Sequence, residues 1–273
     1  MRILVVDAFT DRPFAGNPAG VCLLDVPADP AWMQRVAAEM RHSETAFVRP
    51  LDDEFELRWF TPTVEIELCG HATLAAAHAL YETGTVPDGR PIRFRTLHSG
   101  VLTVRTGATG LLEMDFPATP PEPVPVPEGL ADAIGVPPVW TGRSAQNDLL
   151  LELPDEKTVR ELAPDIPALA ALDARVVIVT ARPDHPAGGS DFVSRVFGPR
   201  VGSDEDPVTG SAHCALAPYW TGKLGRPDLQ GHQVSERGGL VRTELRGDRV
   251  LLSGDAVTVL DGELRATPDT NNT

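Results

Sequence analysis

The stretch ELCGHATLAAAHAL, residues 67–80, and the stretch DPVTGSAHCALAPYW, residues 206–220, determine the fold that this sequence predicts. Each contains a glycine, then a small polar residue, then a run of small apolar residues that is typical of a buried helix. The two glycines, Gly70 and Gly210, lie in different halves of a chain of 273 residues. The same kind of helix start, present twice, predicts two similar structural units.

The composition narrows the class of protein. A hydrophobic content of 42% is ordinary for a globular protein with a core. A net charge of −15 without a Lys/Arg cluster argues against nucleic acid as a partner. The three cysteines, Cys22, Cys69 and Cys214, contain no CxxC pair, which argues against a disulfide framework and against a zinc ribbon.

The hydropathy pattern argues against a membrane location. No apolar run approaches the ~18 residues that a membrane helix requires. The first residues, MRILVVDAFTDRP, include an acid and lack the basic start and cleavage site of a signal peptide. We therefore expect a cytoplasmic protein with no membrane partner.

Strand-like and helix-like segments alternate in both halves, which indicates an α+β fold. Short turns such as TGATG, 106–110, suggest antiparallel pairing. A proline-rich segment, 117–127, has the composition of an extended linker. We predict an N-terminal domain over 1–116 with a C-terminal strand at about 256–265, and a second domain over 128–255. Helices are expected near 30–41, 71–83, 128–135, 158–172 and 210–223.

The two glycine-marked helix starts are candidate anion sites. The first turn of a helix presents four unpaired N–H groups and a partial positive charge. If the two units pack with pseudo-symmetry, both helix ends point at a shared cleft that holds a carboxylate. Helix starts of this kind also occur in ordinary packed cores, where a His or Ser serves as a cap. Polar residues at both starts favour the site: His71 at one, and Asp206, Thr209, Ser211 and His213 at the other.

Glu44 is the candidate acid/base. In RHSETAFV, 41–48, it follows a predicted helix and precedes an apolar strand, so partial desolvation is expected to raise its pKa toward neutrality. A capping or surface role is the alternative for such a residue. The sequence has no G-x-S-x-G, HExxH, G-x-G-x-x-G or P-loop motif, so no other common catalytic pattern competes. The run DEDP, 204–207, is interpreted without further context as a solvated acidic turn.

The ordered blocks of this chain resemble one enzyme family, the PhzF-like isomerases of the phenazine-biosynthesis type. The resemblance extends from residue 4 to about residue 260. It implies the diaminopimelate-epimerase-like fold, in which two pseudo-symmetric α+β domains each wrap a central helix in a mostly antiparallel curved sheet. The blocks that carry it are DAFTDRPFAGNPAGV, SETAFV, WFTPTVEIELCGHATLAAAHAL and FVSRVFGPRVGSDEDPVTGSAHCALAPYW.

The resemblance also implies an active site between the domains that uses no cofactor and no metal. Glu44 matches the family's general acid/base. The supporting catalytic residues implied by the resemblance are His71, Asp206 and Ser211, and the substrate-binding residues are Asn17, Gly70, Ala72, Thr209 and Gly210. The resemblance also implies a possible homodimer.

The resemblance implies a proton shift, of the 1,3 type, on a small carboxylated and unsaturated substrate. Related epimerases use one cysteine at each helix entrance, but here only Cys69 is so placed and Cys214 lies a turn deeper. Two alternatives stay open: a cofactor-independent racemase or epimerase that uses Cys69, and a non-catalytic small-acid binding protein. Dihydro-hydroxyanthranilate is the family's best-known substrate. Two departures concern substrate contacts: LVRTEL, 240–245, where a Gly-Arg-Pro-Ser segment is frequent, and His42, where Asn is frequent.

Overall fold

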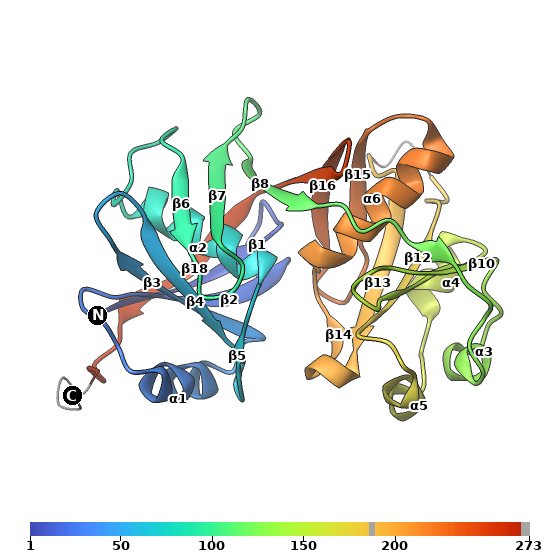
Figure 1. The fold of residues 1–273 in the computed structure, drawn as a ribbon, viewed down its shortest axis with the longest axis horizontal. Coiled ribbons are helices and arrows are strands. Elements are labelled where there is room, and N and C mark those ends of the chain that lie inside the picture. Colours follow the sequence, from blue (N-terminus) through green and yellow to red (C-terminus); the bar gives the residue numbers. More distant parts are fainter. Residues whose placement is uncertain (186–188, 269–273) are drawn as a thin grey trace. The chain divides into compact units, whose positions relative to one another are not determined.

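The computed structural model describes residues 1–185 and 189–268 (Figure 1). The chain divides into two compact units. Unit 1 consists of Met1–Asp115 and Ser253–Thr273, and unit 2 consists of Phe116–Leu252. Among the described residues, no helix is both long enough and apolar enough to cross a membrane.

The described residues of unit 1 form strands of mixed direction with two helices. Strand β1 pairs antiparallel with β2 and with β18, β2 pairs parallel with β3, and β3 pairs antiparallel with β4. Strand β4 then pairs antiparallel with β5 and parallel with β6, and β6, β7 and β8 continue antiparallel. The elements are β1 Arg2–Ala8, β2 Asn17–Leu23, α1 Pro30–Met40, β3 Glu44–Pro50, β4 Phe55–Phe60, β5 Glu65–Ile66, α2 Gly70–Glu82, β6 Ile92–Arg95, β7 Val101–Thr106, β8 Leu112–Pro117 and β18 Ala256–Glu263.

The described residues of unit 2 form strands of mixed direction with four α-helices. Strand β10 pairs antiparallel with β9 and β11, β11 pairs parallel with β12, and β12 pairs antiparallel with β13. Strand β13 pairs antiparallel with β14 and parallel with β15, which pairs antiparallel with β16. The elements are β9 Glu122–Pro123, α3 Leu130–Ile134, β10 Trp140–Arg143, β11 Leu149–Glu152, α4 Glu156–Glu161, α5 Ile166–Ala171, β12 Val177–Ala181, β13 Phe192–Gly198, a 3₁₀ helix Pro199–Val201, β14 Ser203–Asp206, α6 Gly210–Leu224, β15 Asp228–Gln233, β16 Gly239–Arg246 and β17 Arg249–Gly254.

The two units repeat one connectivity. The pairing order of β1 to β7 in unit 1 is the same, strand for strand and direction for direction, as that of β10 to β16 in unit 2. Helix α2 follows β5 and helix α6 follows β14, so the two helices hold the same place in the repeat. The predicted repetition of the helix start is therefore confirmed as a repeated fold.

Small residues allow each of these helices to lie within its unit. In α2, Ala75, Ala76 and Ala77 are consecutive and fully buried, so the helix is enclosed on all sides rather than on one face. Figure 1 shows α2 among the strands of unit 1, where it contacts β1, β2, β3 and β18, while α1 lies at the margin of the unit.

The core of unit 2 lies on both faces of its sheet. Leu149 and Leu151 of β11 pack with α3, α4 and α5, whereas Leu150 packs with α6. Alternate residues of a strand point to opposite faces, which explains this division. The sheet is therefore covered by α6 on one face and by three short helices on the other.

Two local predictions are wrong. One helix was expected over 158–172, but α4 ends at Glu161 and α5 begins at Ile166. Pro164 cannot donate a helical hydrogen bond, and Asp165 caps the new helix at Ala168 N. The acidic run expected as a solvated turn is strand β14, in which Glu205 forms an ion pair with Arg195.

The proline-rich segment 117–127, predicted as a linker, belongs to unit 2. Pro218 lies inside α6 and lacks the N–H that would bond the Cys214 carbonyl. Thr119 N donates to that carbonyl instead, at 3.0 Å. Downstream, Glu122–Pro123 pairs with β10. The segment is thus fixed to unit 2 by hydrogen bonds from its non-proline residues.

Candidate active site

The parallel pairing of β2 and β3 brings the unit 1 site residues together. Asn17 is the first residue of β2 and Glu44 is the first residue of β3, with Ala19 and Glu44 as partners in the register. Neighbouring parallel strands begin at the same end of a sheet, so the Asn17 and Glu44 side chains lie at that end. Helix α2 begins beside them, with Cys69 as its N-cap and His71 as its second residue.

His71 is the centre of a hydrogen-bonded group at this end of the sheet. Its Nδ1 lies 3.3 Å from Asn17 Nδ2, and its Nε2 lies 3.2 Å from Glu44 Oε2. Ser43 donates to Asn17 Oδ1, which leaves the Asn17 amide nitrogen as the donor to His71. His71 Nδ1 is therefore an acceptor, so the proton of a neutral ring is on Nε2 and faces Glu44.

The Glu44 carboxyl is desolvated. Its side chain is 18% exposed, and Oε2 is buried without a well-directed hydrogen bond among the described residues. Burial raises the pKa of Glu44 above its usual value, and hydrogen bonds with Ser43 and Cys69 oppose this shift. A carboxylate with an under-satisfied oxygen and a raised pKa is suited to accept and return a proton.

The first turn of α2 lies beside this carboxyl and offers backbone donors. Cys69, as N-cap, forms no side-chain hydrogen bond to the turn. Gly70 begins the helix, and the Ala72 side chain is fully buried. The group that Ala72 can offer to a ligand at this turn is therefore its backbone amide. Amides in this position, together with the helix dipole, favour an anion.

The unit 2 site residues gather at the start of α6. Asp206 ends β14, Thr209 is the N-cap of α6, and Gly210 and Ser211 open the helix. Thr209 donates its hydroxyl to the Asp206 carboxylate, so both side chains are engaged with each other. The backbone N–H of Thr209 also donates a hydrogen bond. The amides that follow Thr209 are therefore the candidate anion donors.

Gln233, the last residue of β15, is a supporting residue that sequence reasoning missed. It is fully buried, and its Oε1 accepts from Thr209 N at 2.8 Å. Its Nε2 donates to the Asp206 carbonyl at 2.7 Å and lies 3.2 Å from the Thr209 hydroxyl. Gln233 thus fixes the chain that enters α6. No local pattern around it in the sequence signals this role.

Replacing Gln233 by Leu is expected to destabilise unit 2 and to loosen the entrance of α6. The change leaves the Thr209 amide and the Asp206 carbonyl without their partners, at a cost of about 2 kcal/mol. Urea unfolding followed by circular dichroism measures this loss. Gln230→Leu is the control, because Gln230 lies in the same strand and is more exposed than Gln233. An unaltered urea midpoint for Gln233→Leu contradicts the prediction.

The two cysteines near the helix starts differ in their surroundings. Cys69 Sγ lies 3.5 Å from His71 Nδ1 and also hydrogen-bonds the Glu44 carboxyl. Cys214 Sγ points back to the carbonyl of Gly210, one turn earlier in its own helix, at 3.7 Å. Cys69 is therefore part of the site group, whereas Cys214 bonds within its own helix.

One set of side chains has the donor types that bind a transition metal. Single ligand atoms of Glu44, Cys69 and His71 all lie within 4.8 Å of one another. Carboxylate, thiolate and imidazole together suit zinc. The same three groups also complete a hydrogen-bonded chain without a metal, as described above.

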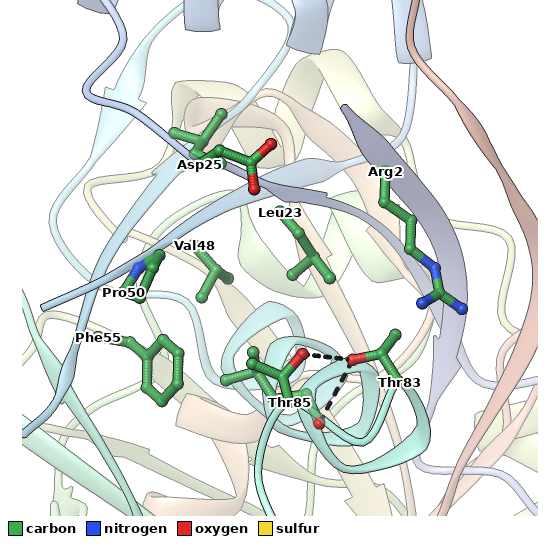
Figure 2. Close-up of a pocket in the computed structure, with 10 residues that line it drawn as sticks. Arg2, Leu23, Asp25, Val48, Pro50, Phe55, Thr83 and Thr85 are labelled. Atoms are coloured by element: carbon green, nitrogen blue, oxygen red, sulfur yellow. Dashed lines mark hydrogen bonds between the residues drawn. The ribbon is translucent and has the colours of Figure 1, made fainter.

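A pocket of about 270 Å³ lies at the other end of α2 (Figure 2). Its wall is largely apolar, with Leu23, Val48 and Phe55 among the lining residues. Thr83, the C-cap of α2, bonds the Thr85 hydroxyl at 2.8 Å and the Ala79 carbonyl at 2.7 Å. None of the predicted site residues lines this pocket, so it is not the candidate active site.

Comparison with known proteins places these features in a family. The family model for phenazine biosynthesis-like proteins, PhzC-PhzF, matches residues 6–262. An uncharacterized isomerase of Halalkalibacterium halodurans is 48% identical over 263 residues, which cover 96% of this chain and 97% of the relative. A crystal structure of a PhzF family protein from Enterococcus faecalis has a TM-score of 0.91 at 40% identity and covers 97% of this chain and 99% of that one.

The wider fold extends to racemases. A crystal structure of a probable proline racemase from Agrobacterium radiobacter, with bound carbonate, has a TM-score of 0.62 at 12% identity, with 99% of this chain and 94% of that chain covered. This likeness shows the fold alone, and it confirms the expected epimerase-like α+β architecture. Together with the full-length family match, these similarities show that the chain belongs to the PhzC-PhzF, or phenazine biosynthesis-like, protein family.

Proposed function

We propose that this protein is a cofactor-independent isomerase that moves a proton from one carbon to another of a small, unsaturated carboxylic acid. The observation that carries the proposal is the state of Glu44: a desolvated carboxyl with a raised pKa, beside His71, at the amino end of a buried helix. The family membership and the isomerase named among its relatives support the same reaction class.

The reaction begins with Glu44 ionised. Its carboxylate removes a proton from a carbon that is activated by the adjacent unsaturation, and the electron pair delocalises through the substrate. The protonated Glu44 then gives this proton to a carbon two positions away, so the double bond migrates and the carboxyl returns to its starting state. A base with a pKa near the working pH serves both steps.

Two further groups of residues assist this transfer. First-turn amides of α2 bind the substrate carboxylate and stabilise negative charge that develops on it, at about 10²–10³-fold for each well-placed donor. His71 presents its Nε2 proton toward Glu44, which favours the ionised carboxylate before the first step and after the second. In unit 2, Asp206 and Ser211 at the start of α6 are the residues assigned to substrate contact.

Deuterium incorporation tests the proposal. The protein is incubated in heavy water with a panel of unsaturated acids that includes dihydro-hydroxyanthranilate, and products are examined by mass spectrometry and NMR. We expect one deuteron at the new carbon, with migration of the double bond. We also expect full activity after dialysis against EDTA, because no step uses a metal. Saturable binding without exchange across the panel supports a non-catalytic acid-binding protein instead.

A second candidate function is a racemase or epimerase in which Cys69 acts on one face of the substrate. The contact of the Cys69 thiol with His71 and Glu44 favours it. Inversion at a single carbon without bond migration identifies this reaction.

Replacing Cys69 by Ser distinguishes the two functions. A serine hydroxyl keeps a hydrogen bond to Glu44, so the single-carboxylate reaction is expected to retain its rate within about threefold. A reaction that needs the thiolate loses about 10³-fold or more, because a serine hydroxyl is a far weaker base. The rate of deuterium incorporation measures the difference, and Cys214→Ser is the matched control. A large loss for Cys69→Ser alone excludes the single-carboxylate mechanism.

A further inference from the structure

Three side chains of unit 1 form one cluster of metal-ligating donors. They are Glu44 at the start of β3, Cys69 as the N-cap of α2, and His71 as the second residue of that helix. Single ligand atoms of the three lie within 4.8 Å of one another. Cys69 and His71 are buried, whereas the Glu44 side chain is 18% exposed. An ion in solution therefore reaches the cluster at the carboxyl.

The separation of the sulfur and the imidazole nitrogen suits a zinc ion. Cys69 Sγ lies 3.5 Å from His71 Nδ1. A zinc–sulfur bond of about 2.3 Å and a zinc–nitrogen bond of about 2.0 Å, at a tetrahedral angle, separate the two ligand atoms by about 3.5 Å. The neutral ring carries its lone pair on Nδ1, since Nε2 holds the proton. The Asn17 amide, which lies 3.3 Å from Nδ1, is the contact that a metal replaces.

Glu44 supplies the third donor. Its Oε2 is buried and has no well-directed hydrogen bond within the described parts of the chain, while the carboxyl as a whole hydrogen-bonds Cys69. A buried carboxylate oxygen in this state is stabilised by a cation. Three protein ligands leave the fourth position of a tetrahedral zinc ion to water. The cluster thus offers thiolate, imidazole and carboxylate, three donor types that zinc accepts.

We propose that Glu44, Cys69 and His71 form a zinc-binding site through which Zn²⁺ reversibly inhibits the proton transfer. Zinc occupies the carboxylate lone pair that removes the substrate proton, so the metal-bound protein does not begin the reaction. As the zinc–sulfur bond forms, the Cys69 thiol releases its proton to water and the ion loses water molecules of its hydration shell. The binding stands on the donor geometry alone, whereas the inhibition rests on the proposed function, because it takes Glu44 as the base.

Cobalt(II) alone is the probe for the metal-binding step, because it accepts the tetrahedral geometry of zinc and, unlike zinc, absorbs visible light. Titration of the reduced full chain with Co²⁺ should give a thiolate-to-cobalt charge-transfer band in the near ultraviolet and the intense visible bands of a tetrahedral ion. Zn²⁺ alone should displace the cobalt, with a Kd of about 1 µM or lower. Surface carboxylates and histidines do not give the thiolate band, so its absence overturns the inference.

Substitutions locate the metal. Changes outside the ligand shell of a metal site cost about 10–100-fold in affinity, so loss of a ligand should cost at least about a hundredfold. Cys69→Ser should therefore abolish the thiolate band and weaken zinc binding to that extent. Glu44→Gln should keep the band and weaken zinc binding about tenfold or more. Cys214→Ser, which removes another buried free cysteine, is the matched control and should change neither. A band that survives Cys69→Ser overturns the inference, as does wild-type zinc affinity in Glu44→Gln.

Deuterium exchange on the best substrate of the acid panel tests the inhibition. Zn²⁺ at about ten times its Kd should lower the exchange rate about tenfold, and excess EDTA should restore it. Mg²⁺ at the same concentration is the control and should have no effect, because it prefers oxygen ligands and retains its water. Unchanged exchange at saturating zinc overturns the inhibitory role. If no acid exchanges, the proposed isomerase fails, and the cobalt and zinc titrations, which need no substrate, still decide the metal site.

Discussion

Replacement of Glu44 by Gln is expected to reduce deuterium incorporation at least a hundredfold while the fold stays intact. The amide oxygen of Gln can still accept from His71, but the side chain can neither take nor return a proton. General acid/base groups contribute about 10²–10⁴-fold, which sets the expected range. The rate of exchange on the best substrate of the acid panel measures the effect.

The same substitution is expected to stabilise the protein at neutral pH. Burial raises the pKa of Glu44 in the folded state, so the folded protein binds this proton more tightly than the unfolded chain does. Its contribution to stability is therefore greatest at low pH and falls as pH rises through the folded pKa. Gln at this position removes that loss, so Glu44→Gln should gain stability relative to the unaltered protein as pH rises. Thermal unfolding at pH 4 and pH 8 checks the sign.

Glu56→Gln is the matched control for the activity measurement. Glu56 lies in β4 of the same unit, pairs with Arg49 and takes no part in the site. Its replacement makes the same change in net charge and should leave exchange unaltered. Exchange that persists within threefold in Glu44→Gln would refute the assignment of the proton transfer to this residue.

Acidification is expected to unfold the protein through His213. This residue of α6 is fully buried, and burial lowers its pKa to about 4, with a hydrogen bond to the Thr209 carbonyl opposing the shift. In the unfolded chain a histidine takes its proton near pH 6.5. Between these values the unfolded state binds a proton that the folded state does not. The free energy of unfolding should therefore fall by about 3 kcal/mol as pH decreases from 6.5 to 4.

Comparison with His213→Gln isolates this contribution. Gln keeps a donor for the Thr209 carbonyl and has no proton to gain, so its stability should depend less steeply on pH. Urea unfolding at pH 7, 6, 5 and 4.5 gives the two slopes. Other groups titrate in both proteins, and the difference between the slopes belongs to position 213. Parallel pH profiles for the two proteins contradict the assignment.

The fold was largely predictable because its main signals are local. Gly70 and Gly210, with the small residues after them, mark two buried helices, and the structure confirms both. The error at 158–172 was also local: Pro164 ends one helix and Asp165 begins the next, and both signals were present in the sequence. The proline-rich segment differs, because its attachment depends on a carbonyl that Pro218 frees about a hundred positions away.

The candidate site was predictable only where local pattern or resemblance pointed to it. Asn17, Glu44 and His71 are brought together in unit 1, and Asp206, Thr209 and Ser211 in unit 2. Gln233 and Arg175 carry no comparable signal, and nothing in the residues around them indicates a contact with α6. They reach it because β15 and β12 take particular places in the sheet.

The sequence by itself determined the α+β class, the repetition of one helix entrance and the residue types available at each start. Those features depend on hydrophobic period, glycine and proline, which act over a few neighbouring residues. Only the tertiary structure decided that the Glu44 carboxyl is largely buried and that the Arg175 guanidinium contacts Ser211. Both features depend on strand register and close packing, which bring together residues that are distant in the chain. A carboxyl is desolvated only when neighbouring elements pack over it.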